Sequence, residues 1–253
     1  ITRSELTVRM EHAFLIGTRA QDVDMRNRYM AIFDKSLSRT AASRLSYVLA
    51  SQNWDTLSDS YWLSQVIHLM FGSVELNSPA ELHPEDFKLM QPSFLFGTYA
   101  KDPRIADVMV DDDLESLVSS HRRFVTQLAD VKIKDIFEPL GHLQHTDNNL
   151  AHDIWVAFFP LAWTALTKDD QSDLEKGMVA LLTKDFHNRQ LDKRPNCVAT
   201  MLDAIVHAKP RVKFPPHIMK YLAQTYNAWY TAAVYMEESA ISPVVDVEKL
   251  RES

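Results

Sequence analysis

Three histidines in the middle of the chain have the spacing of metal ligands. His142 and His145 stand one helical turn apart, and His152 follows after a predicted turn. Imidazole nitrogens are ordinary zinc ligands, so two on one helical face and a third nearby make a candidate zinc site. Asp147 and Asp153 would have to complete its ligand shell. The other interpretation is a solvated turn, and metal-dependent hydrolysis by an α-helical enzyme therefore stands as the alternative function.

Other residues that could bind a metal ion or act as a nucleophile have simpler structural explanations. The run Asp111–Asp113 could attract a divalent ion, but carboxylates at the start of a helix also suit its positive end. Cys197 starts a predicted helix, where a thiol can be activated, yet no histidine is near it in sequence. The chain has no Gly-x-Ser-x-Gly, His-Glu-x-x-His or Gly-x-x-x-x-Gly-Lys motif. The leading expectation is therefore a protein without catalytic residues, metal or cofactor.

Basic clusters and aromatic residues form a pattern that suits peptide binding. Cationic side chains steer an acidic segment, and an apolar groove anchors it. The alternative is that the cations mark solvated helix ends and that most tryptophans belong to the core. The candidate partner-binding residues are Trp54, Tyr61, Trp62, Arg122, Arg123, Lys132, Lys134, Arg211 and Lys213.

The elements that position these residues are helices. Apolar residues recur at three- and four-residue spacing, and no segment alternates convincingly as a strand would. Pro160 should kink or split the helix that contains it. Consecutive helices with short turns predict an all-α fold of about ten helices, an α-solenoid of HEAT- or TPR-like hairpins rather than a closed bundle. The apolar spans are 6–17, 25–37, 41–49, 63–71, 114–128, 133–140, 150–167, 174–182, 198–206 and 218–233.

Two of these helices share a starting pattern. Asp22 precedes one and Asp147 precedes the other, and an apolar residue follows at each turn. Aspartate is a preferred N-cap because its carboxylate accepts hydrogen bonds from the first backbone amides. The likeness fits an internal repeat, but it also fits any two capped amphipathic helices.

One stretch breaks the helical pattern. Residues 73–112 contain four of the eleven prolines, and we interpret them as an acidic, partly mobile connection between helical blocks at 1–72 and 113–253. The net charge of −7 is concentrated here, because residues 75–115 hold 10 acidic and 3 basic residues whereas the remainder holds 24 of each. The helical blocks are neutral overall and can accept an acidic ligand at local basic ridges.

Composition excludes several classes of protein. Five glycines and one cysteine in 253 residues argue against glycine-rich phosphate loops, intrachain disulfides and cysteine-based zinc fingers. The acidic balance disfavours a third hypothesis, a solenoid that binds nucleic acid in a basic groove. The longest apolar stretch, 154–166, is shorter than the about 20 residues of a membrane span. The chain starts at Ile1, so we expect a fragment of a much larger protein.

Five sequence strings resemble one protein family. The chain is similar, most clearly at 11–70 and 114–240, to the TRRAP/Tra family of transformation/transcription domain-associated proteins, which are relatives of the phosphatidylinositol-3-kinase-related kinases. The resemblance is to a helical-repeat portion ahead of the kinase-like region, so no catalytic residue carries over. The strings are MRNRYMAIFD at 25–34, QNWD at 52–55, SDSYWL at 58–63, SSHRRF at 119–124 and QHTD at 144–147.

The resemblance implies a function that the residues alone do not. Members of the family are nuclear scaffolds with a pseudokinase domain and no enzymatic activity, shared by SAGA-type and MYST-type histone acetyltransferase complexes. Their helical repeats receive transcription activators and contact other subunits. The resemblance therefore implies a co-activator segment that is not an enzyme. Its partners would be acidic or Myc-type activation segments and neighbouring subunits, without membrane or direct nucleic-acid contact.

Overall fold

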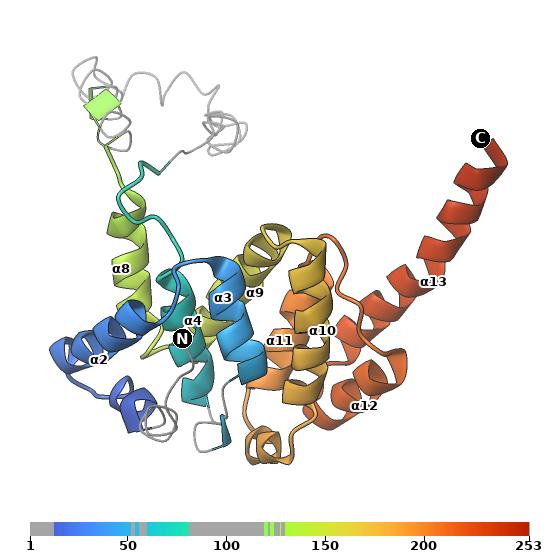
Figure 1. Ribbon diagram of the computed structural model, residues 1–253, viewed down its shortest axis with the longest axis horizontal. Coiled ribbons are helices and arrows are strands. Elements are labelled where there is room, and N and C mark those ends of the chain that lie inside the picture. The colour runs from blue at the N-terminus through green and yellow to red at the C-terminus, as the bar shows by residue number, and fades with distance from the viewer. Residues whose placement is uncertain are drawn as a thin grey trace, which may run out of the picture. The chain divides into compact units, whose positions relative to one another are not determined.

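The chain folds into helices joined by turns, as a computed structural model shows (Figure 1). The structure describes residues 13–51, 54–55, 60–80, 119–120, 122–123, 127 and 130–252, with the backbone alone at 50–51, 60–62 and 241–252. Apart from an isolated bridge between Pro79 and Lys132, no β-structure occurs within these ranges. The all-α prediction is confirmed there. The predicted helix at 114–128 and the first half of that at 6–17 fall mostly outside the described residues.

The chain divides into two compact units. One contains the residues up to Val74 and those from Pro139 onward, and the other is Glu75–Glu138. Both predicted helical blocks thus contribute to the first unit, and most of the predicted connection at 73–112 lies outside the described residues. No described helix is long and apolar enough to cross a membrane. The helical elements are α2 (Val23–Ser36), α3 (Ala41–Ser46), the π-helical turn η1 (Tyr47–Ser51), α4 (Ser60–Phe71), α8 (Ile133–Leu143), α9 (Asn148–Thr164), α10 (Lys168–Leu182), the 3-10 helix η4 (Asp185–Gln190), α11 (Cys197–His207), α12 (Pro216–Tyr226) and α13 (Trp229–Glu252).

Helix α9 is the central element of the larger unit. It packs against both α4 and α11, while α10 packs against α3 and η1, and α11 continues the contacts to α12 and α13. Trp155, Phe159 and Trp163 recur every four residues along α9, and all three are fully buried. Their rings follow one another with centroids 5.5 and 5.9 Å apart. This aromatic row is a fully buried apolar face of α9.

Aspartate caps start α2 and α9 in the same way. The Oδ1 atom of Asp22 accepts hydrogen bonds from the amides of residues 24 and 25 at 2.8 and 3.3 Å. Asp147 accepts from residues 149 and 150 at the same two distances. Both predicted caps are confirmed, and each fixes the first turn of a helix that packs against α4.

One helix is continuous where a split was possible, and one predicted helix is divided. Of the kink or split expected at Pro160, the split does not occur, because α9 continues through this residue as one helix to Thr164. Conversely, the single helix expected at 218–233 is two helices, because Asn227 adopts the left-handed conformation (φ 59°, ψ 44°) and ends α12. Asparagine tolerates this conformation better than most residues, and it is a known helix stop.

A buried arginine joins the first helices of the larger unit. The side chain of Arg44 is fully buried, yet its guanidinium donates to three acceptors on different segments. These are the Asp34 carboxylate at 2.9 Å, the carbonyl of Ser38 at 3.1 Å and the carbonyl of Leu69 at 2.6 Å. A buried cation is tolerated only when its donors are matched in this way.

We expect the substitution Arg44→Met to lower the free energy of unfolding by about 3 kcal/mol, because it strands Asp34 and two carbonyls. Urea unfolding of the chain measures the change. The matched control is Lys176→Met on α10, whose side chain is 81% exposed and which should alter stability by less than about 0.5 kcal/mol. Equal stabilities of the two variants would contradict this role of Arg44.

Candidate partner-binding surfaces

The predicted aromatic groove near the start of α4 does not form around Trp54. The Trp54 side chain is fully buried, and its indole N–H donates to the Val48 carbonyl at 2.8 Å. Tyr61 and Trp62 lie in the first turn of α4, but their side chains are outside what the structure describes. Trp54 is therefore a core residue, as the alternative interpretation of the tryptophans had it.

Four of the predicted basic residues belong to the smaller unit. Arg122 and Arg123 are exposed at helical positions, and Lys132 and Lys134 are exposed at and just after the isolated bridge. Lys134 faces Glu138 one turn later, with nitrogen and oxygen 3.7 Å apart. An exposed pair of this kind has little effect on stability, but it partly neutralises the cation.

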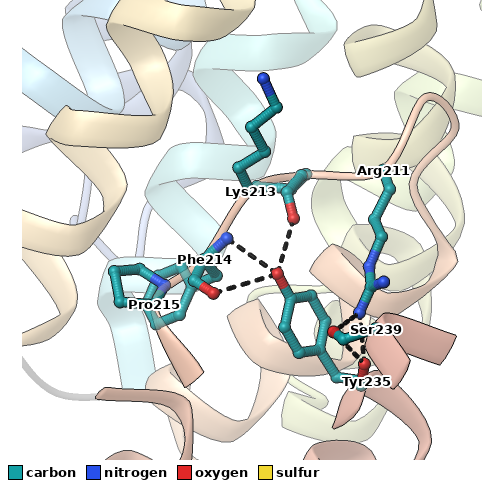
Figure 2. Close-up of a pocket in the computed structure, with 7 residues that line it drawn as sticks. Arg211, Lys213, Phe214, Pro215, Tyr235 and Ser239 are labelled. Carbon is teal, nitrogen blue, oxygen red and sulfur yellow. Dashed lines mark hydrogen bonds between the residues drawn. The ribbon is translucent and has the colours of Figure 1, made fainter. Parts of the chain in front are cut away.

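Arg211 and Lys213 lie together at an open groove of about 590 Å³. They belong to the extended segment between α11 and α12, in which Val212 and Phe214 are buried while Lys213 is exposed. This polar–apolar alternation is what an extended chain requires when one side faces the core. Figure 2 shows Arg211 turned toward α13 and Lys213 extending away from it. The lining residues are Arg211, Val212, Lys213, Phe214, Pro215, Tyr235 and Ser239.

Tyr235 of α13 holds this extended segment in place. Its hydroxyl accepts the Phe214 N–H at 2.8 Å and shares its own proton between the carbonyls of Val212 and Phe214, at 3.0 and 3.1 Å. The Arg211 guanidinium lies over the Tyr235 ring, 4.2 Å from its centroid. It also donates to the Tyr235 carbonyl and to the Ser239 hydroxyl. Tyr235 thus fixes both the extended backbone that lines the groove and the guanidinium of Arg211.

The groove has a positive charge that its own walls do not neutralise. Arg211 and Lys213 are the charged side chains among its lining residues, and no lining residue is acidic. Glu175 of α10 accepts a hydrogen bond from the Lys213 backbone N–H at 2.8 Å, but no ion pair involves the Lys213 ammonium in the described part of the chain. The Arg211 Nε atom is buried and has no hydrogen-bond partner among the described atoms. Such a site can attract a carboxylate and offer it a charge-assisted hydrogen bond.

Sequence reasoning found the two cations of the groove but missed its other walls. Tyr235 and Ser239 are more than twenty residues away, so no local pattern could join them to Arg211. The alternation from Arg211 to Pro215 was the available signal, since it marks an extended segment between two helices. Because one helix was predicted at 218–233, the start of a separate helix at Trp229, the first residue of α13, was missed, and so was the position of Tyr235 on it.

The predicted set of zinc ligands is wrong. His152 points to α11, where its Nδ1 lies 2.8 Å from the Thr200 hydroxyl and its Nε2 lies 3.8 Å from Asp203. His145 instead meets His68 of α4, with ring nitrogens 3.4 Å apart. Within the described residues, no three histidine, cysteine, aspartate or glutamate side chains are grouped to hold a metal ion. His68 was not a candidate because 77 residues separate it from His145.

The other chemical candidates also have structural roles or lie elsewhere. The arrangement of Thr200, His152 and Asp203 resembles a nucleophile with its base, but Thr200 is fully buried and no substrate can reach it. Cys197 is buried at the start of α11, and its backbone N–H donates to the Gln190 side chain at 2.9 Å. Asp111–Asp113 lie outside the described residues.

Comparisons with known proteins identify the family. Residues 1–208 match the Tra1 HEAT repeat ring region. The chain belongs to the Tra1/TRRAP family. HEAT repeats are stacked helical hairpins, so the α-solenoid prediction and the family resemblance are both confirmed. The match ends just before the segment that carries Arg211 and Lys213.

Long relatives of the Tra1/TRRAP family match nearly the whole chain. The Saccharomyces cerevisiae SAGA complex/NuA4 acetyltransferase complex subunit TRA1 is 32% identical over 251 residues, which are 99% of this chain and 7% of the relative. The Schizosaccharomyces pombe subunit of the same description is 29% identical over 92% of the chain and 6% of its own length. The human transformation/transcription domain-associated protein is 26% identical over 95% of the chain and 7% of its own length. The chain thus spans a small fraction of these relatives.

The His68–His145 pair predicts a pH-dependent stability. Burial, with the neighbouring histidines adding to it, lowers the pKa of His68 to about 4 and that of His145 to about 3. The unfolded chain takes up these protons below about pH 6.5, whereas the folded chain does not until near pH 4. Stability should therefore be fully present above pH 6.5 and decline as the pH falls toward 4.

Urea unfolding at pH 7 and pH 5 measures this decline. The double variant His68→Gln/His145→Gln should lose less stability between the two values than the wild-type chain. His187, whose pKa burial also lowers to about 4, stays in the variant and preserves part of the effect. His207→Gln, at an exposed position of α11, is the matched control. An unchanged pH dependence in the double variant would contradict the assignment.

Proposed function

We propose that the chain is a non-catalytic scaffold segment of a nuclear transcription co-activator in histone acetyltransferase complexes. Its membership of the Tra1/TRRAP family supports this role, as do relatives named as subunits of SAGA and NuA4 acetyltransferase complexes. A helical-repeat segment offers long surfaces between stacked hairpins, and such surfaces are suited to holding other proteins. The segment binds transcription activators, neighbouring subunits or both.

The chemistry of the described residues favours binding over catalysis. The polar clusters around His145 and His152 are buried or hydrogen-bonded within the fold, and the groove at Arg211 and Lys213 contains no acid–base pair. No observation favours the metal-dependent hydrolase, because its three histidines are not assembled. The net charge of −7 also argues against direct nucleic-acid binding.

The groove at Arg211 and Lys213 is the observation that carries the partner assignment. Two cations with no acidic residue in the groove lining attract an acidic segment, and the walls formed by Phe214, Pro215 and Tyr235 give it an apolar anchor. Arg211 is held against Tyr235 before any ligand arrives, so little side-chain freedom is lost on binding. The partner that fits is an extended acidic segment with an aromatic or aliphatic side chain, as activation segments of transcription factors have.

Three exposed aromatic side chains of α12 and α13 favour contacts with large apolar partners. Tyr221 of α12 and Trp229 and Tyr230 of α13 are 57%, 52% and 84% exposed. Aromatic residues with this exposure are typical of interface anchors rather than of a free surface. These residues are suited to contacts with a neighbouring subunit or with further repeats of the same polypeptide.

The acidic-segment assignment can be tested with a fluorescent peptide. The probe contains several aspartates, one phenylalanine and flanking prolines that keep it extended. We expect Lys213→Glu and Arg211→Ala each to weaken its binding to the chain about tenfold, equivalent to about 1.4 kcal/mol. Fluorescence anisotropy measures the dissociation constants, and added salt should weaken wild-type binding.

A matched control separates the groove from general electrostatics. Lys209→Glu changes the same charge four residues before Lys213, at an exposed position outside the groove lining. It should weaken binding less than Lys213→Glu does. Equal effects of the two reversals would remove the groove from the proposal and leave only diffuse attraction.

The scaffold role has to be tested in the full-length protein. Deleting residues 139–240 from a tagged full-length protein should reduce the co-purification of acetyltransferase subunits from nuclear extract, measured by quantitative mass spectrometry. The point variant Lys213→Glu should keep those subunits and lose only acidic activators. Undiminished recovery of every subunit after the deletion would contradict a scaffold role for this segment.

A further inference from the structure

The outer face of α2 carries a regular stripe of exposed side chains. Met25, Arg28, Ile32 and Lys35 follow one another at spacings of three, four and three residues, which places them on one face of the helix. Met25 and Ile32 are 50% and 42% exposed, and both cations are exposed as well. We call these four residues the α2 seam. The opposite face, with Arg26, Met30 and Phe33, is buried.

The seam has the period of a helix-pairing surface. Met25 and Ile32 are seven residues apart, and so are Arg28 and Lys35. This heptad spacing is the one that lets a second helix lie along the first at a crossing angle of about 20°. The apolar pair would meet the partner's apolar residues, and the cationic pair would meet its charges.

The seam differs from the surfaces that join helices inside the unit. α9 and α11 are in contact, and both helices carry fully buried apolar side chains such as Trp155, Phe159, Met201 and Ile205. The α2 seam instead alternates apolar and cationic residues. Interfaces between separate proteins have such mixed composition more often than a repeat core does. The seam is therefore better suited to a separate polypeptide than to another repeat of the same chain.

Charge identifies the kind of partner. Neither Arg28 nor Lys35 forms an ion pair within the described residues, and the neighbouring carboxylate of Asp34 is used by the buried Arg44. A second copy of the chain would place like charges against each other in a parallel pairing, and in an antiparallel pairing it would leave each cation opposite an apolar residue, Lys35 opposite Met25 and Arg28 opposite Ile32. Both arrangements are unfavourable. Glutamates or aspartates opposite Arg28 and Lys35 would compensate both cations.

We propose that the α2 seam docks an acidic amphipathic helix contributed by another polypeptide. The site is separate from the groove at Arg211 and Lys213 and does not depend on it. Asp22 caps the first turn of α2, and the pairing of Asp34 with Arg44 holds its last part. A helix fixed at both ends presents the seam without further ordering, so docking loses little conformational entropy.

A designed helical peptide tests the proposal. The probe has about 18 residues, or five helical turns, with leucines at heptad spacing and flanking glutamates, and it binds the chain in a fluorescence anisotropy assay. We expect Arg28→Glu/Lys35→Glu and Met25→Ser/Ile32→Ser each to weaken binding at least tenfold. The same peptide with lysines in place of glutamates should not bind the wild-type chain. Thermal unfolding checks that both double variants remain folded.

Matched variants elsewhere keep the result specific. Leu161→Ser changes a 71% exposed leucine of α9, and Lys176→Glu reverses an exposed charge of α10. Both should bind the probe as the wild-type chain does, and so should Lys213→Glu in the separate groove. If these variants weaken binding as much as the seam variants do, the proposal is overturned. This outcome does not depend on the result of the peptide test at the groove.

The source of the helix is tested in the full assembly. A photoreactive amino acid at position 28 or 32 of the full-length protein should cross-link to an acidic helical segment of another subunit, identified by mass spectrometry. A cross-link to the same polypeptide, or tighter binding of the chain to phosphatidylserine vesicles than to the peptide, would overturn the proposal.

Discussion

The arrangement of the first helices depends on one buried cation. The Arg44 guanidinium has no exposed surface, so it can be buried only if Asp34, the Ser38 carbonyl and the Leu69 carbonyl reach it together. A methyl group at Gly72 would collide with it, which explains why the turn after α4 has a glycine there. This single requirement brings the end of α2, the start of α3 and the end of α4 to one point. The direction in which the α2 seam faces follows from that arrangement.

A second constraint positions the helices that form the groove at Arg211 and Lys213. α9, which carries the aromatic row, packs against α11, and Asn196 at the start of α11 both caps that helix and donates to the Tyr226 carbonyl at 3.2 Å. Tyr226 ends α12, and the left-handed Asn227 then turns the chain into α13. Only after this turn does Tyr235 reach the extended segment at 211–215. The groove is therefore held in place by helix caps and helix ends rather than by a mobile loop.

Local features of the fold could be predicted from sequence, whereas contacts between distant segments could not. Asp22 and Asp147 act within three residues of themselves, so their capping was visible in the sequence. The period of the apolar residues likewise predicted where most helices lie. The partners of His145 and Arg211 come from segments 77 and at least 24 residues away, and no spacing rule connects them. Trp54 was misassigned for a different reason: its partner Val48 is only six residues away, but an aromatic residue suits a groove as well as a core, and its burial depends on how the chain folds around η1.

The two candidate surfaces follow from how a solenoid uses its side chains. A repeat has to bury one face of each helix to be stable, and here that requirement is met by aromatic and aliphatic residues of α4, α9 and α11. Apart from the buried Arg26 and Arg44, cations are not part of that packing. Lys213 and the two cations of the α2 seam are exposed beside apolar residues, and Arg211 is half-buried against Tyr235. Because a rigid backbone holds both sets in fixed geometry, they can select acidic partners of different shape: an extended segment at the groove and a helix at the seam.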